Sequence, residues 1–162
     1  MKKIAVLFFI CAMLACDESP TQADNDYSNY FPIELNNSWT YSSTTGSTTQ
    51  THHIWETRVY DNQVYSLWGS ESTNTVPLLY EDGKIFRIQN NEKMVWLDFT
   101  IEDGGTYTYN ASDKVNYTVT VTRDIRCECD ENTWQNCIEF FFDDASKVNE
   151  ELTYTLAPDI GI

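Results

Sequence analysis

The chain has 162 residues, and its 25 acidic side chains against 10 basic ones give a formal net charge of −15. This acidity excludes nucleic acid as a partner, because phosphate binding requires a basic face. The length favours a single domain, and an aromatic content of 14% argues against intrinsic disorder.

The first fifteen residues have the pattern of a secretory signal peptide. A short basic start precedes an uncharged apolar run over residues 4–15 (IAVLFFICAMLA), which is too short to span a bilayer comfortably. The run ends in Met13-Leu14-Ala15-Cys16, so that a small residue directly precedes a cysteine. This ending resembles the lipobox of bacterial lipoproteins, with Met13 standing where Leu is commonest and Leu14 where a small residue is commonest.

The lipobox resemblance implies that residues 1–15 are cleaved off and that Cys16 becomes the acylated first residue. Each buried CH₂ group contributes about 0.8 kcal/mol, so two or more acyl chains give stable attachment. We therefore expect the N-terminal lipid to hold the chain on a membrane of the bacterial cell envelope. The outer membrane or cell surface is favoured, and the inner membrane is the alternative because Asp17 resembles a retention signal there. An ordinary signal peptide, with Cys16 incidental, is the other interpretation.

Residues 16–28 are predicted to form an acidic tether, and residues 29–162 a single β domain. The segment from Asp17 to Ser28 (DESPTQADNDYS) is polar and acidic, with almost no apolar side chain from which to build a core. The domain should therefore stand away from the membrane on a flexible linker.

From Trp39 onward, short β-prone segments alternate with turn signals, which predicts an all-β domain. The clearest hairpin has Asp82-Gly83 between two apolar runs (LLYE and KIFRI), because a type I′ turn needs positive φ at both central residues. Residues 114–123 (KVNYTVTVTR) alternate apolar and polar side chains, as a half-buried antiparallel strand does. Further strands are expected at 38–44, 48–60, 63–72, 93–99, 106–110, 136–143 and 149–157. The turn spacing indicates an antiparallel meander that forms a sandwich or a curved, partly closed barrel.

Three cysteines follow Cys16, and an exported chain meets an oxidising compartment, so a disulfide is expected. A hairpin loop around residues 130–134 would place Cys127 opposite Cys137, and a shifted register would place Cys129 there instead. Cys127 and Cys129 share one strand face, so only one of them can pair with Cys137. We favour Cys127–Cys137, with Cys129–Cys137 as the alternative, over a thiolate metal site that would lack a nearby histidine.

The sequence carries no catalytic motif, and we predict no catalytic residue, no metal site and no cofactor. There is no G-x-S-x-G elbow, no H-E-x-x-H and no phosphate-binding glycine loop. The two histidines, His52 and His53, are adjacent and on a strand would point to opposite faces, so they cannot share one metal ion. An enzyme that uses paired carboxylates is the least favoured hypothesis.

The aromatic residues carry the one functional lead. The chain holds five Trp, ten Tyr and eight Phe, which either fill a small β core or line a concave site. Trp134 lies in a polar segment (DENTWQN) that we expect to be a loop, so it is the one tryptophan that we assign a candidate ligand contact.

Four segments of the chain resemble a set of uncharacterised small envelope lipoproteins: YFPIELNNSWTYSS (30–43), LLYEDGKIFRI (78–88), NCIEF (136–140) and TYTLAPDIGI (153–162). Asn36-Asn37 stands where that set usually has Gly, and Asp159-Ile160-Gly161 where it has Gly-Val-Gly. The chain stops at Ile162, where those proteins continue for another strand's length, which is consistent with a truncated reading frame. The resemblance implies a small β-rich lipoprotein and carries no catalytic residues.

We therefore expect a lipid-anchored cell-envelope protein with a non-catalytic structural or binding role. The alternative is a carrier or binding module that holds a small apolar ligand or a glycan on an aromatic-lined concave sheet. The sequence names no protein partner.

Overall fold

A computed structural model of the chain describes residues 26–42, 49–60, 62–112, 115–129, 131–147 and 151–161. The predicted signal peptide, Cys16 and most of the predicted tether lie outside these residues. The described part contains one short 3₁₀ helix and ten strands, so the all-β prediction is confirmed. The elements are η1 (Ser28–Tyr30), β1 (Ser38–Ser42), β2 (Thr49–Tyr60), β3 (Gln63–Glu71), β4 (Asn74–Glu81), β5 (Lys84–Gln89), β6 (Glu92–Asp98), β7 (Thr106–Ser112), β8 (Val115–Cys129), β9 (Asn132–Asp143) and β10 (Leu152–Leu156).

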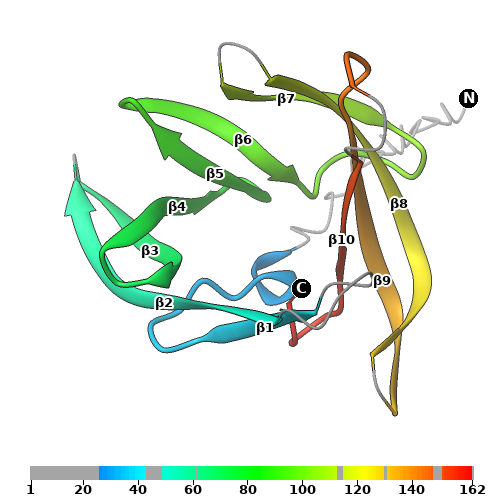
Figure 1. Ribbon diagram of the computed structural model, residues 1–162. Helices are drawn as coiled ribbons and strands as arrows, with labels where there is room; N and C mark the ends of the chain where they lie inside the picture. Colours follow the sequence, from blue (N-terminus) through cyan, green and yellow to red (C-terminus); the bar gives the residue numbers. More distant parts are fainter. Residues whose placement is uncertain are drawn as a thin grey trace, which may run out of the picture.

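The strands form two antiparallel sheets, each a meander in which every strand pairs with its neighbour in the chain. The first sheet has the order β1-β2-β3-β4-β5-β6, and the second has the order β10-β9-β8-β7. Figure 1 shows the six-stranded sheet curling from β1 round to β6, with the four-stranded sheet facing its open side. The two sheets are not closed into a barrel, so the predicted meander takes the form of a curved sandwich.

Two tight hairpins follow from residues that tolerate a left-handed backbone. Asp82 and Gly83 have φ values of 51° and 70°, as the predicted type I′ turn between β4 and β5 requires. Asn90 and Asn91, with φ values of 51° and 64°, make the equivalent turn between β5 and β6. Asn serves here because its short polar side chain lowers the cost of the left-handed region.

The main core lies between the two sheets and is rich in aromatic side chains. Val119 and Val121 of β8 are fully buried while Asn116 and Thr118 are exposed, so the predicted alternation of this strand is confirmed. The tryptophans of this core are Trp39, Trp68 and Trp96.

The six-stranded sheet is also apolar on its outer face, away from the main core. Leu67 and Leu79 lie outside the main core cluster, yet they are only 5% and 6% exposed. Consecutive apolar residues in the sequence, such as Ile85-Phe86, are typical of strands that are covered on both faces.

The disulfide Cys127–Cys137 is present, with the two Cα atoms 6.0 Å apart. The predicted register is wrong, because Cys127 lies opposite Trp134 and Cys137 lies opposite Ile125, so the bond crosses the hairpin diagonally. Irregularities interrupt the β8–β9 ladder on both sides of Ile125, and they shift the pairing. The turn is also shorter than predicted, because Cys129 already pairs with Asn132.

Candidate functional site

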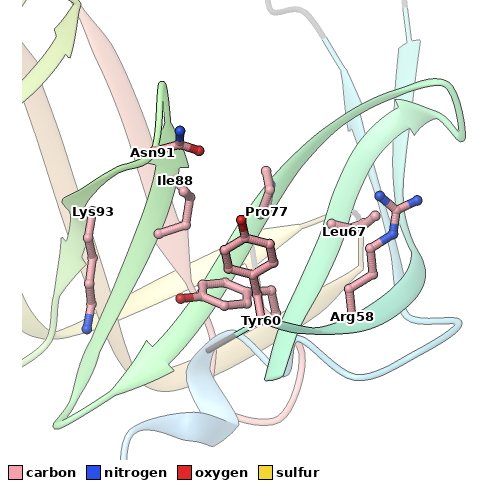
Figure 2. A pocket seen from close by; sticks show the side chains of 8 residues that line it. Arg58, Tyr60, Leu67, Pro77, Ile88, Asn91 and Lys93 are labelled. Carbon is pink, nitrogen blue, oxygen red and sulfur yellow. The ribbon is translucent and has the colours of Figure 1, made fainter. Parts of the chain in front are cut away.

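A hollow lined by described residues lies on the outer face of the six-stranded sheet (Figure 2). Its volume is about 540 Å³, which is within the range of small-molecule sites. We call it the outer groove, and its lining residues are Arg58, Tyr60, Tyr65, Leu67, Pro77, Ile88, Asn91 and Lys93.

Strand alternation and register place these side chains together. Ser66 and Trp68 of β3 point into the main core. Because side chains alternate along a strand, Tyr65 and Leu67 point to the outer face. Leu67 of β3 pairs directly with Pro77 of β4, and Ile88 of β5 pairs directly with Lys93 of β6. Figure 2 shows Ile88 and Lys93 on one side of the groove and Leu67 and Arg58 on the other, with Pro77 and Tyr60 between them.

The lining of the groove combines apolar and aromatic side chains. Leu67, Pro77 and Ile88 are its apolar residues. Tyr60 is 69% exposed as a residue, which leaves it accessible to a ligand. The Tyr65 hydroxyl donates a hydrogen bond of 3.0 Å to the Gln63 side chain, which holds this second ring in place.

The two cations of the groove are already paired with carboxylates. Lys93 forms an ion pair with Glu81 and lies 4.2 Å from the centre of the Phe86 ring. The hydrogen bond from Lys93 lowers the pKa of the Glu81 carboxyl below its ordinary value. Arg58 pairs with Glu56. The groove is therefore electrically balanced within an acidic molecule, and the eight side chains drawn in Figure 2 include no carboxylate of their own.

Trp134 lines a different cavity, of about 370 Å³, at the disulfide end of the β8–β9 hairpin. The prediction that it sits in a loop is wrong, because it lies within β9 and pairs across the ladder with Cys127. Its ring is partly buried rather than projecting freely. The other residues of this cavity are Ile125, Arg126, Cys127, Glu128, Glu139, Thr155, Ala157, Ile160 and Gly161.

The two histidines lie in different surroundings. The His52 ring stacks on Trp68 with the ring centres 4.4 Å apart, whereas His53 lies 4.8 Å from the ring of Trp55. Burial, and then the charge of Arg87, lower the pKa of His52 below its ordinary value. Among the described residues, no group of three or more His, Cys, Asp or Glu side chains is placed to hold a metal ion.

Sequence reasoning missed both the outer groove and Arg87. The continuous apolar runs of LLYEDGKIFRI were the available signal for the groove, because they indicate a sheet that is covered on both faces. Period-two alternation in the same segment places Arg87 on the core-facing side together with Ile85, which is fully buried.

Comparison of the chain with protein-family models, curated proteins and solved structures finds no match in any of the three. In the part of the chain that the structure describes, no helix is both long and apolar enough to cross a membrane.

Proposed function

We propose that this chain is a lipid-anchored protein of the bacterial cell envelope with a non-catalytic binding role, and that its outer groove takes a neutral glycan. The lipobox-type ending at Cys16 supports the anchor, and the outer groove supports the binding role. The Trp134 contact remains a separate prediction.

The character of the groove favours a glycan over an apolar ligand. A sugar ring stacks its C–H face on an aromatic ring and keeps its hydroxyls in hydrogen bonds, for which Tyr60 and the Asn91 amide are available. Because the groove is open to solvent at Tyr60, an apolar ligand would leave much of its surface in water. The balanced ion pairs at Arg58 and Lys93 give no net attraction for a charged ligand.

The test is a glycan array probed with the full chain in detergent, followed by calorimetry on the sugar that binds most strongly. Tyr60→Ala should weaken binding about tenfold, because an aromatic ring at the centre of a site typically contributes more than about 1 kcal/mol. Val59→Ala is the matched control, since Val59 is 72% exposed and points to the other face of β2.

Absence of glycan binding would contradict the proposal. So would equal losses for the Tyr60 and Val59 variants. Binding of an uncharged apolar probe that Tyr60→Ala abolishes, without any glycan binding, would show that the groove takes an apolar ligand instead.

A further inference from the structure

A second candidate site lies on the core-facing side of the same sheet, around Arg87. We propose that the Arg87 guanidinium binds the carboxylate group of a small organic acid with an apolar body. This site is separate from the outer groove and does not depend on the function proposed for that groove.

The backbone directs Arg87 toward the space between the sheets. On β5 it pairs with Leu78 of β4 and with Met94 of β6. Leu78 is fully buried and Met94 packs against the main core, so this face of the sheet is the inner one. Arg87 itself is only half-buried, which leaves it within reach of a solute.

The guanidinium lies between two indole rings. Its Cζ atom is 3.8 Å from the ring centre of Trp96 and 5.1 Å from that of Trp68. From the opposite sheet, the Tyr109 hydroxyl lies 3.4 Å from the Arg87 Nη1 atom, which is a long hydrogen bond. These rings stabilise the cation, but they do not neutralise it.

Arg87 stands apart from the other basic residues that the structure describes. Five of the seven described Lys and Arg side chains form an ion pair with a carboxylate. A sixth, Arg123, donates to the backbone carbonyl oxygens of Phe99 and Ile101 at 2.7 and 3.1 Å. Arg87 instead hydrogen-bonds the hydroxyls of Tyr109 and Tyr154, and no ion pair joins it to a carboxylate of the described residues, although the chain is strongly acidic.

Two buried donors beside this cation also lack an acceptor. The Arg87 Nε atom and the Trp68 Nε1 atom are both buried without a hydrogen-bond partner. A buried donor that is left unsatisfied typically costs about 1–3 kcal/mol. A ligand that brings acceptor oxygens to this place would recover that cost.

The chemistry of the side chains around Arg87 favours a carboxylate. A guanidinium presents N–H donors in a planar fork that matches the two oxygens of a carboxylate. The neighbouring indole and phenol rings offer contacts to an apolar or aromatic body. Inorganic phosphate has no apolar body and carries more charge to desolvate, so it should bind here less well.

The test is a nuclear magnetic resonance titration of the ¹⁵N-labelled full chain in detergent micelles. The probes are phenylacetate, its neutral analogue phenylacetamide, and inorganic phosphate. Phenylacetate should shift the Arg87 Nε–H and Trp68 indole N–H signals in a saturable manner, and the other two probes should not. Equal shifts with phenylacetamide or with phosphate would overturn the proposal, as would the absence of any shift with phenylacetate.

A pair of variants tests whether the planar fork is needed. Arg87→Lys keeps the positive charge and removes the fork, so the affinity for phenylacetate should fall about tenfold. Lys147→Arg is the control, because Lys147 is exposed, lines neither of the two cavities and pairs with Asp144, and this variant should bind phenylacetate as the unmodified chain does. Unchanged affinity in Arg87→Lys would contradict the proposal. If that variant does not fold, the comparison of the three probes on the unmodified chain decides the question.

Discussion

The indole nitrogen of Trp39 donates a hydrogen bond of 3.0 Å to the backbone carbonyl of Ile160, which is 121 residues further along the chain. Beside it, the backbone N–H of Asp159 donates to the carbonyl of Asn29 at 2.8 Å. The first and last described segments of the β domain are therefore joined directly. These two segments contain the YFPIELNNSWTYSS and LAPDIGI patterns, so residues from the two patterns contact each other in the folded domain.

Substitution of Gly161 should disrupt this contact. A Cβ atom at Gly161 would overlap the Trp39 Nε1 atom, and the residue has a φ of 91° that L side chains rarely adopt. Gly161→Ala should therefore lower the free energy of unfolding by more than about 2 kcal/mol, through both overlap and backbone strain. Thermal unfolding measures this effect.

Gly104→Ala is the matched control for that experiment. Gly104 also has a positive φ of 73°, but a Cβ atom there would meet nothing within 4 Å. Gly104→Ala should therefore lower the free energy of unfolding by only about 1 kcal/mol, through backbone strain alone. Equal losses for the two variants would show that the Trp39 contact does not limit stability.

Loss of the disulfide should destabilise the domain, whereas loss of the third cysteine should not. Cys137→Ala opens a link between residues 10 apart in sequence, which should cost about 2–3 kcal/mol of unfolding free energy. Cys129→Ser should change little in comparison. Peptide mapping without reductant should recover Cys127 joined to Cys137, and recovery of Cys129 joined to Cys137 would contradict the assignment.

The anchor prediction concerns Cys16. If the proposed anchor is present, Cys16→Ser should move the chain from the detergent phase to the aqueous phase, because the acyl chains would supply the membrane affinity. Cys11→Ser is the control and should leave partitioning unchanged, since Ile10 rather than a small residue precedes Cys11. Mass analysis of the N-terminal peptide should show acyl groups on Cys16. Membrane attachment that survives Cys16→Ser would rule out the lipid anchor.

The pKa of His52 predicts a pH dependence of stability. Burial and the Arg87 charge lower this pKa in the folded protein, so the unfolded chain binds the proton more readily. Stability should therefore fall as the pH drops from about 7.5 to 5.5, through the ordinary histidine pKa near 6.5. His52→Gln should flatten this part of the melting-temperature profile, and His53→Gln should leave it in place. A profile that is already flat in the unmodified chain would refute the prediction.

Local chemistry made much of the fold predictable. Asp82-Gly83 predicts the turn between β4 and β5, because this dipeptide favours a type I′ turn by itself. The alternation around Val119 predicts both the strand and the face of it that is buried, because this signal also depends only on neighbouring residues. The diagonal position of the Cys127–Cys137 bond could not be derived, since irregularities in the β8–β9 ladder depend on tertiary packing that a period-two pattern does not record.

The candidate sites were harder to predict than the strands. The outer groove joins Arg58 of β2 to Lys93 of β6, so its existence depends on how the whole sheet curves and not on any single segment. The polar neighbours of Trp134 led to the prediction that it lies in a loop. It belongs to a strand, and strands with one solvent-facing side ordinarily carry exposed polar residues.

The contact between Asn29 and Asp159 also makes this domain suited to backbone cyclisation. Since the two residues already touch, a short peptide linker between the ends of the domain could close the chain into a ring with little distortion of the native structure. Such a ring would reduce the entropy of the unfolded chain and thereby raise the melting temperature. A new pair of termini could then be opened at the exposed β4–β5 turn, where Asp82 projects into solvent.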